Sequence, residues 1–188
     1  MSYSSRGQWP SAPRPSVSTV LAPPYPSSLS AHPARTSRGA SEILPQLFIS
    51  DLSFAENPAC LASYGITHIL SALPDRILVP SEAQLYPQPR RLQIRVEDSP
   101  FAELAAHLPM ATAWIRDALR TSPNARVLVH CVEGVSRSVS VVAAFLIAQY
   151  GWTPAEAVQY IKSKRRVADP NFGFVQQLGE YRRSLGLQ

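Results

Sequence analysis

Short apolar runs and longer mixed stretches alternate along this chain from about residue 41 to its end. The apolar run 126–129 follows the turn-forming segment 122–124, so it predicts a buried strand. Leu92, Ile94 and Val96 alternate with polar residues, as the residues of a second strand do. The patterns predict helices over 57–64, 101–120, 138–150, 153–164 and 171–184. Strands that alternate with helices favour an α/β fold, with a central, mostly parallel sheet and helices on both faces.

Two of the expected helices carry clear end signals. Thr153 suits a helix N-cap, Pro154 the first helical position, and Glu156 the third position of a capping box. The stretch 138–150 is mostly apolar and is followed by Gly151, a residue typical of helix C-termini. It therefore predicts a buried helix that ends at this glycine.

The first 40 residues differ from the rest in composition. They hold 7 of the 18 prolines, 10 serines and four arginines, and they contain no acidic residue. Such a segment cannot bury enough apolar surface to offset the entropy lost on ordering. The chain is therefore expected to divide into a disordered tail, 1–40, and one folded domain, 41–188, which is large enough for a single hydrophobic core.

The tail also bears on cellular location. An N-terminus that is rich in serine and arginine and free of acids is typical of mitochondrial transit peptides, but its many prolines oppose an amphipathic helix. Ser2 stands where myristoylation requires glycine, and no secretory signal is recognisable. The longest apolar run, 141–148, is too short to span a bilayer. We expect a cytoplasmic or nuclear protein without a membrane anchor, with a mitochondrial location as the alternative.

The net charge of +5 comes mostly from the tail. The domain carries 14 basic and 13 acidic residues, so the basic balance does not indicate a nucleic-acid partner. Two local basic groups remain, one at 90–91 with Arg95 and one at 162–166. Each is either a solvated surface or a border of the functional cleft that steers an anionic substrate.

The loop between the strand 126–129 and the helix 138–150 carries the candidate chemistry. A strand, a tight loop and a helix N-terminus in this order point successive backbone N–H groups at one anion. Cys131 opens the loop, and a thiol at a helix N-terminus beside a guanidinium readily becomes a nucleophilic thiolate. Arg137 can grip two oxygens of a phosphoryl group through its planar fork. The expected phosphate-binding residues are Val132, Glu133, Gly134, Val135, Ser136 and Arg137.

Three further residues are expected to support this cradle. Gly134 allows a backbone conformation and a close approach that a side chain would block. Ser138 can donate a hydrogen bond to the cysteine sulfur and assist it as a leaving group. His130 is expected to buttress the loop through a ring N–H rather than to act as a base. The loop lacks a Walker-type Gly-Lys-Ser/Thr sequence, so nucleotide binding of that kind is not indicated.

The chain contains two cysteines, Cys60 and Cys131. An inert buried thiol is the alternative interpretation of Cys131, but the neighbouring Gly134 and Arg137 favour a reactive one. Cys60 stands in an ordinary helical stretch, which predicts core packing. The cysteines lack the spacing of a disulfide framework or a zinc site, so neither a metal nor a cofactor is expected. A redox pairing of the two cysteines stays open.

The motif His130-Cys131-x-x-Gly134-x-x-Arg137-Ser138 resembles the signature of the cysteine-dependent protein phosphatases, and its Gly-Val-Ser-Arg-Ser part resembles their dual-specificity branch, small atypical type. The resemblance covers roughly 41–185. It includes an opening strand pair at 43–50, a further strand at 65–72, and the start of the last helix at 169–174 with Gln177 and Leu178. The resemblance implies a catalytic domain with the cysteine phosphatase fold.

A phosphatase of this kind needs a proton donor for the departing oxygen. Asp98 is our choice, because it begins a loop at a strand end, where α/β folds place functional groups. The resembled family carries its general acid on such a loop. Glu97 and Asp169 are rival candidates, and Asp98 itself fits an ordinary turn residue before Ser-Pro. The resemblance also implies that Asn171 hydrogen-bonds back to the phosphate loop, while a helix N-cap is its simpler interpretation.

Three functions are compatible with these residues. The favoured one is a metal-independent phosphatase that removes phosphate from phosphotyrosine and phosphoserine/threonine in phosphoproteins through a phosphocysteine intermediate. The second is a phosphatase of a phospholipid, an RNA 5′ end or a phosphoglycan, and the third is an inactive phosphate-binding module. Glu133 and the absence of lysine from the loop argue against phosphoinositides. No phosphotyrosine-recognition loop is recognisable, so the resemblance implies a shallow cleft, and a monomer is expected.

Overall fold

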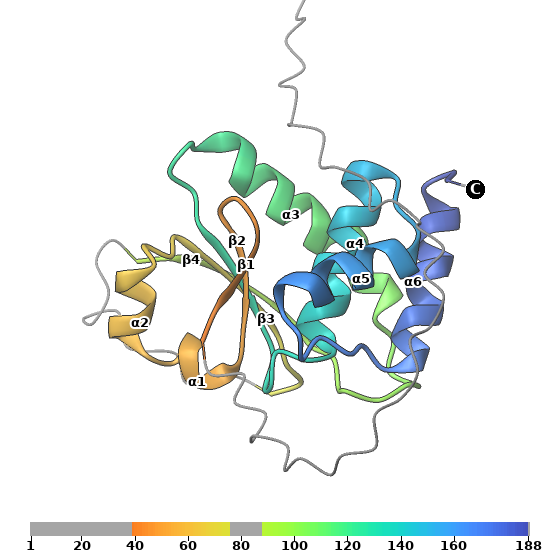
Figure 1. Cartoon of the computed structure of the whole chain (residues 1–188), viewed down its shortest axis with the longest axis horizontal. Coiled ribbons are helices and arrows are strands. Elements are labelled where there is room, and N and C mark those ends of the chain that lie inside the picture. Colours follow the sequence, from red (N-terminus) through yellow and green to blue (C-terminus); the bar gives the residue numbers. More distant parts are fainter. Residues whose placement is uncertain (1–38, 76–87, 188) are drawn as a thin grey trace, which may run out of the picture.

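The apolar runs of the sequence form a five-stranded sheet with helices on both faces in the computed structural model, which describes residues 39–75 and 88–187 (Figure 1). The strands are β1 (Ser41–Leu44), β2 (Leu47–Ser50), β3 (His68–Ala72), β4 (Arg90–Ile94) and β5 (Val127–His130). The helices are α1 (Leu52–Ala55), α2 (Pro58–Ser63), α3 (Leu108–Thr121), α4 (Arg137–Tyr150), α5 (Pro154–Lys164) and α6 (Phe172–Ser184), with a 3₁₀ turn at Ala105–His107. The tail predicted over 1–40 lies almost wholly outside the described residues.

The sheet has the strand order β1-β2-β5-β3-β4. Only the outer pair β1 and β2 is antiparallel, and β2, β5, β3 and β4 run parallel, as the sequence predicted. His130, the last residue of the central strand β5, is level with Ser50 on one neighbour and Ser71 on the other. The carboxyl ends of the parallel strands therefore meet at one edge of the sheet, where α/β proteins bind ligands.

Helix α4 packs at the centre of the larger core. Its residues from Arg137 to Ile147 are all buried, which is the arrangement expected of a helix that is apolar on all sides. Helices α3, α5 and α6 surround α4 on one face of the sheet, and α1 and α2 cover the other face (Figure 1). The predicted α/β class with helices on both faces is confirmed. Among the described helices, none is long and apolar enough to cross a bilayer.

The helix ends follow the predicted signals. The Thr153 hydroxyl accepts a hydrogen bond from the Glu156 backbone at 3.2 Å, and the Glu156 carboxylate accepts one from the Thr153 backbone at 2.8 Å. This capping box starts α5 at Pro154. Gly151 ends α4 in the left-handed conformation, with φ of +71°.

The helix predicted over 101–120 begins only at Leu108, so the first part of that prediction is wrong. Gln177 of α6 explains the difference. Its side-chain oxygen accepts hydrogen bonds from the backbone N–H groups of Leu104 and Ala105 at 2.7 and 2.8 Å, and its amide donates to the carbonyl of Ala102 at 2.9 Å. These contacts with a side chain of a neighbouring helix replace α-helical hydrogen bonds, so the segment forms only the 3₁₀ turn Ala105–His107 before α3 begins.

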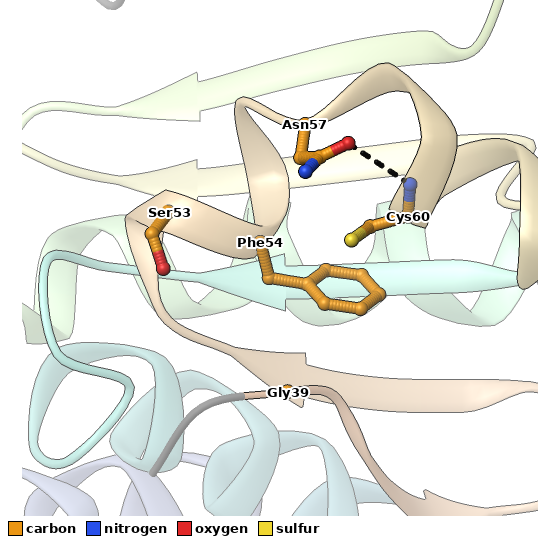
Figure 2. Close-up of a pocket in the computed structure, with 5 residues that line it drawn as sticks. All are labelled: Gly39, Ser53, Phe54, Asn57 and Cys60. Carbon is orange, nitrogen blue, oxygen red and sulfur yellow. Dashed lines mark hydrogen bonds between the residues drawn. The ribbon is translucent and has the colours of Figure 1, made fainter. Parts of the chain in front are cut away.

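A pocket of about 560 Å³ lies beside α1 and α2, on the face opposite α4 (Figure 2). It is lined by Gly39, Ser53, Phe54, Asn57 and Cys60. Cys60 is half-buried and packs against the smaller core, which agrees with the predicted packing role. Asn57 caps α2 by accepting a hydrogen bond from the Cys60 backbone at 3.2 Å. Both cysteines are free thiols.

Candidate active site

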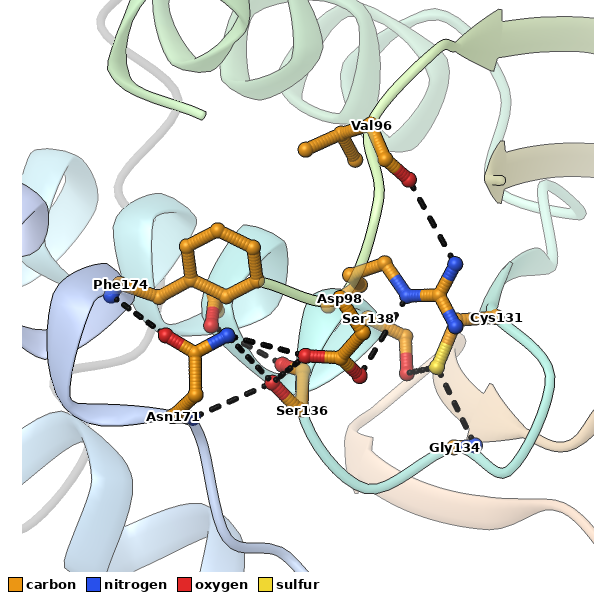
Figure 3. A network of polar contacts seen from close by, with 10 residues as sticks. Val96, Asp98, Cys131, Gly134, Ser136, Ser138, Asn171 and Phe174 are labelled. Carbon is orange, nitrogen blue, oxygen red and sulfur yellow. Dashed lines mark hydrogen bonds and ion pairs between the residues drawn. The ribbon is translucent and has the colours of Figure 1, made fainter. Parts of the chain in front are cut away.

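Cys131 follows β5 directly and lies at the floor of the loop that leads into α4. The residue is 1% exposed. Its sulfur accepts a hydrogen bond from the backbone N–H of Gly134 at 3.2 Å, and the Ser138 hydroxyl lies 3.3 Å from the same sulfur (Figure 3). A thiolate has no proton to donate, so both neighbours would act as donors to it. The surroundings of Cys131 thus suit the charged form of a nucleophile.

The carbonyl groups of the four loop residues 132–135 are bonded to groups outside the loop. The Val132 carbonyl accepts a hydrogen bond from the Leu52 backbone at 2.9 Å, and the Val135 carbonyl accepts one from the Asp169 backbone at 2.8 Å. The carbonyls of Glu133 and Gly134 accept from the Arg165 side chain at 3.3 and 2.7 Å. With its acceptors engaged elsewhere, the loop can offer its N–H groups to an anion, as an anion-binding nest does.

Arg137 is the first residue of α4 and is 7% exposed. Its Nε lies 3.4 Å from Oδ2 of Asp98, and its Nη1 donates to the carbonyl of Val96 at 3.5 Å (Figure 3). The guanidinium therefore spans the distance between the cysteine loop and the segment after β4. A planar cation in this position can bind two oxygens of a phosphoryl group.

Asp98 is the carboxylate that the fold brings to the cysteine loop. Its Oδ1 accepts hydrogen bonds from the Ser136 hydroxyl at 2.7 Å and from the Asn171 amide at 2.9 Å, while Oδ2 faces Arg137. The carboxylate of the rival candidate Asp169 instead pairs with Lys162 at 3.7 Å. Among the three candidates, Asp98 is thus the one whose carboxylate is bonded to Ser136 and faces Arg137.

Asn171 makes both contacts that its sequence position allowed, the helix cap and the hydrogen bond to the phosphate loop. Its Oδ1 caps α6 by accepting from the Phe174 backbone at 3.0 Å, and its backbone N–H donates to the Ser136 hydroxyl at 3.1 Å (Figure 3). The contact of its amide with Asp98 had no signal in the sequence, because it depends on how α6 approaches the loop after β4. The hydroxyl of Ser136 likewise bonds to Asp98, in addition to the expected place of Ser136 in the phosphate loop.

The basic run 162–166 does not form one solvated surface. Lys162, Lys164 and Arg166 are exposed, but Arg165 is 4% exposed and bonds to the cysteine loop. The contact of Arg165 with the loop had no signal in the sequence, because a buried arginine within a run of basic residues cannot be told from its exposed neighbours. Burial lowers the pKa of Arg165, while the nearby Asp51 and Cys131 act in the opposite direction.

Residues 47–184 match the family model described as dual specificity phosphatase, catalytic domain. The chain belongs to the dual specificity phosphatase family. This confirms the resemblance drawn from the cysteine motif, and the chain is accordingly a protein phosphatase in family and fold. The match begins at β2 and ends with α6, so it contains every residue of the network around Cys131.

Relatives from distant organisms share this family domain. Dual specificity protein phosphatase 13B of Mus musculus is 37% identical over 141 residues, which cover 73% of this chain and 70% of the relative. Dual specificity protein phosphatase 1 of Arabidopsis thaliana is 35% identical over 139 residues, covering 74% and 67%. A solved structure of a substituted human DUSP28 superposes with a TM-score of 0.71 at 32% identity, covering 79% of this chain and 97% of the other.

In this phosphatase His130 lies beneath the loop. The ring is 1% exposed, and its Nε2 lies 2.7 Å from the Ser71 hydroxyl on β3. The ring therefore ties the end of β5 to β3, and it also interacts with the backbone of Cys131 at the start of the loop. Burial lowers the pKa of His130 to about 4, so the ring is neutral at physiological pH.

The buried His130 should make the stability of this phosphatase depend on pH. An unfolded histidine takes up a proton near pH 6.5, whereas the native ring does so only near pH 4. The free energy of unfolding should therefore fall as the pH drops through this window, by about 3 kcal/mol in total. Denaturant unfolding at pH 7.5, 5.5 and 4 measures it. His130→Asn should show a shallower slope, and an equal slope in both proteins would contradict the assignment.

Two features of the structure require glycine at position 134, its backbone conformation and the space around its Cα atom. Its φ is +68°, and an added Cβ would lie 2.5 Å from the Ser50 carbonyl oxygen and 2.6 Å from Nη2 of Arg165. Gly134→Ala should displace the loop and lower kcat/KM by at least about 10²-fold, the cost of losing an oxyanion donor. Gly65→Ala is a matched control, because Gly65 has a φ of +60° but its Cβ would meet only the Arg126 side chain, at 3.4 Å. The control should lose stability but keep kcat/KM.

Among the described residues, no group of three His, Cys, Asp or Glu side chains lies close enough together to hold a metal ion. Whether catalysis needs a metal is a question for experiment, and its independence of metal stays a prediction. The network around Cys131 brings together one thiol, one carboxylate, one guanidinium and the loop amides.

Proposed function

We propose that this phosphatase hydrolyses phosphotyrosine and phosphoserine/threonine in phosphoproteins, without a metal ion and through a phosphocysteine intermediate. One observation carries the proposal: the Asp98 carboxylate lies 3.4 Å from the Arg137 guanidinium, at the loop that surrounds the sulfur of Cys131. A thiol, a guanidinium and a carboxylate thus lie in one network, which supports the roles of nucleophile, anion-binding cation and proton donor. These are the three groups that phosphoryl transfer to a thiol needs.

In the first step the Cys131 thiolate attacks phosphorus, and a sulfur–phosphorus bond forms as the bond to the leaving oxygen breaks. Asp98, protonated at this stage, gives its proton to that oxygen. Arg137 and the loop N–H groups bind the equatorial phosphoryl oxygens as their charge redistributes. Because the acid must touch the leaving oxygen, the group attached to that oxygen lies beside Asp98.

In the second step water attacks the phosphocysteine, and Asp98 takes a proton from this water as a base. The sulfur–phosphorus bond breaks, and the products are inorganic phosphate and the Cys131 thiolate. The Ser138 hydroxyl, 3.3 Å from the sulfur, can donate to the thiolate as it leaves. The Ser136 hydroxyl, which donates to Oδ1 of Asp98 at 2.7 Å, supports the position of this carboxyl group beside the loop.

The loop composition supports a phosphoprotein substrate. The loop contains the acidic Glu133 and no lysine, and a carboxylate beside the cradle disfavours highly charged anions such as polyphosphorylated lipids. A panel of phosphotyrosine peptides, phosphoserine/threonine peptides and phosphoinositide vesicles, assayed with EDTA and a reductant, tests this. We expect phosphate release to be fastest with phosphopeptides, and activity on the vesicles alone would overturn the proposal.

The same panel separates an enzyme from a binding module. One solved neighbour is a human tyrosine phosphatase-like serine/threonine/tyrosine-interacting protein, with a TM-score of 0.71 at 31% identity, covering 80% of this chain and 99% of the other. Binding of tungstate without release of phosphate from any substrate would favour the alternative of an inactive phosphate-binding module. Turnover of even a small aryl phosphate would exclude that function.

Glu133 should weaken the binding of anions. Its side chain is exposed and its backbone belongs to the loop, so Glu133→Ala should bind inorganic phosphate and tungstate about two- to fivefold more tightly, the size of an exposed charge interaction. Competitive inhibition at low ionic strength measures the effect. Glu180→Ala is the control, because Glu180 is an exposed carboxylate on α6. Equal inhibition constants for wild type and Glu133→Ala would show that this carboxylate does not act on the cradle.

A further inference from the structure

Arg165 occupies an unusual position for an arginine. It lies directly after α5, is 4% exposed, and directs its guanidinium to two parts of the chain that are far apart in sequence. Its Nε and Nη2 donate to the carbonyls of Gly134 and Glu133 at 2.7 and 3.3 Å. Its Nη1 donates to the Gly39 carbonyl and to the Ser41 hydroxyl, both at 3.2 Å. One side chain thus connects the phosphate loop with the N-terminal edge of the domain.

The contacts with the loop fix the direction of its peptide groups. A peptide unit whose carbonyl points to Arg165 presents its N–H on the opposite side, where the anion binds. Two consecutive carbonyls of the loop depend on this one guanidinium. The packing is also tight, because a Cβ on Gly134 would come within 2.6 Å of Nη2. A lysine carries a point charge and no planar fork, so it could not make both bonds in the same geometry.

The charge of Arg165 also acts on the nucleophile. It interacts electrostatically with both Asp51 and Cys131. A buried cation behind an anion-binding loop favours negative charge in that loop, whether on a bound anion or on a thiolate. Geometry and charge therefore work in the same direction.

We propose that Arg165 is a positioning residue that holds the phosphate loop in its anion-binding conformation and couples that conformation to the N-terminal edge of the domain at Gly39 and Ser41. The coupling passes through a single side chain, so a change at Ser41 reaches the loop without touching it. The proposal rests on the proposed function only for the chemical role of Cys131. Anion binding can be measured without turnover, so it tests the positioning role by itself.

The test compares Arg165→Gln and Arg165→Lys with Arg166→Gln, which changes the exposed neighbour. Tungstate binding is measured by calorimetry, and the rate of iodoacetamide alkylation of Cys131 is measured against pH. In Arg165→Gln we expect at least tenfold weaker tungstate binding and half-maximal alkylation at higher pH. Arg165→Lys should restore the wild-type pH profile of alkylation more fully than the wild-type affinity for tungstate, because lysine keeps the positive charge but lacks the planar guanidinium. Arg166→Gln should stay within about twofold of wild type.

A folded Arg165→Gln with wild-type affinity and an unchanged alkylation profile would overturn the proposal. Should this variant not fold, Arg165→Lys and Ser41→Asp decide the question. A carboxylate at position 41 would compete for Nη1 and draw the guanidinium away from the loop. We expect Ser41→Asp to weaken tungstate binding severalfold, and unchanged affinity there would disprove the coupling. If the variants change tungstate binding as expected but the wild type turns over no substrate, only the proposed function is refuted and the positioning role of Arg165 stands.

A second inference concerns two exposed aromatic residues near the proton donor. Phe101 is 92% exposed and Phe172 is 69% exposed. Phe172 follows Asn171, whose amide bonds to Asp98 at 2.9 Å, and Phe101 lies three residues after Asp98. The segments containing the two aromatics lie against each other, because a Cβ on Gly173 would come within 2.0 Å of the Pro100 carbonyl oxygen.

We infer that Phe101 and Phe172 select phosphopeptides with apolar residues next to the phosphorylated residue. This rests on the proposed function, since the leaving oxygen must lie at Asp98 and the substrate chain must then pass over the segments beside it. Large apolar side chains that cover no core gain most from burial against another apolar surface. A phosphopeptide whose flanking residues are leucine or phenylalanine supplies such a surface.

The experiment uses two phosphotyrosine peptides that differ only in having apolar or serine-rich flanks, and p-nitrophenyl phosphate as a substrate without flanks. Phe101→Ala/Phe172→Ala should lose about tenfold in kcat/KM for the apolar peptide, the size of one buried large side chain. Its rates with the serine-rich peptide and the aryl phosphate should change less than twofold. Equal losses on all three substrates, or no loss on any, would overturn the inference. A wild type that turns over the aryl phosphate but neither peptide would refute the proposed function instead.

Discussion

Cys131→Ser is expected to abolish turnover of p-nitrophenyl phosphate, with a loss in kcat of about 10⁴–10⁶-fold, as removal of a covalent nucleophile does elsewhere. A serine hydroxyl at this position keeps a hydrogen-bonding group near Gly134 and Ser138 but is far less acidic than a thiol. The loop and Arg137 should remain in place, so tungstate should still bind. The measurement is release of nitrophenolate with EDTA and a reductant present.

Cys60→Ser is the matched control, because Cys60 is the other free thiol and lies in α2, within the lining of the pocket on the opposite face of the sheet. Its turnover should equal that of wild type. Metal-independent activity that disappears only with Cys131 would establish the thiolate mechanism. Activity that survives in Cys131→Ser, or that EDTA removes from the wild type, would contradict it.

The second large effect is expected from Asp98→Asn. An asparagine can keep the hydrogen bonds to its neighbours but cannot give a proton to the leaving oxygen. We expect kcat for phenyl phosphate, a poor leaving group, to fall by about 10²–10³-fold. The loss for p-nitrophenyl phosphate should be smaller, because nitrophenolate departs without full protonation. The dependence of kcat on leaving-group acidity should therefore become steeper in the variant.

Glu97→Gln and Asp169→Asn control for the two rival carboxylates. Glu97 is the exposed neighbour of Asp98, and Asp169 pairs with Lys162. Neither variant should alter the dependence on leaving-group acidity. A steeper dependence in Asp169→Asn combined with an unchanged one in Asp98→Asn would move the role of general acid to Asp169.

The elements of the site that lie close together in sequence could be predicted, and those that depend on tertiary contacts could not. Cys131, Gly134 and Arg137 lie on one loop between a strand and a helix, so their spacing carried the prediction. Asp98 could be placed because the alternation of apolar residues stops just before it, and parallel strands end at one edge. The contacts of Arg165 are with carbonyls 31 and 32 residues earlier in the sequence, which no local pattern records.

The prediction of a helix over 101–120 was wrong at its start, again because of a tertiary contact. The segment has helical periodicity, yet the Gln177 side chain on α6 takes the backbone N–H groups of Leu104 and Ala105. Tertiary contacts override intrinsic helix preference here, as they commonly do. The same glutamine was recognised in the sequence only as part of the resemblance to the family, without the contact that explains it.

The ion pair between Asp98 and Arg137 makes the enzyme's own carboxylate a competitor of its substrate. A phosphate dianion that enters the loop competes with the ionised form of Asp98 for Arg137, and Asp98 can pair with Arg137 again once inorganic phosphate has left and Asp98 has lost its proton. The loss of the ion pair thus reduces the free energy gained when phosphate binds, and its return assists the release of inorganic phosphate. This favours rapid turnover over tight binding. Asp98→Asn should consequently retain phosphate more tightly than wild type, so the slow variant should also be the one most strongly inhibited by its product.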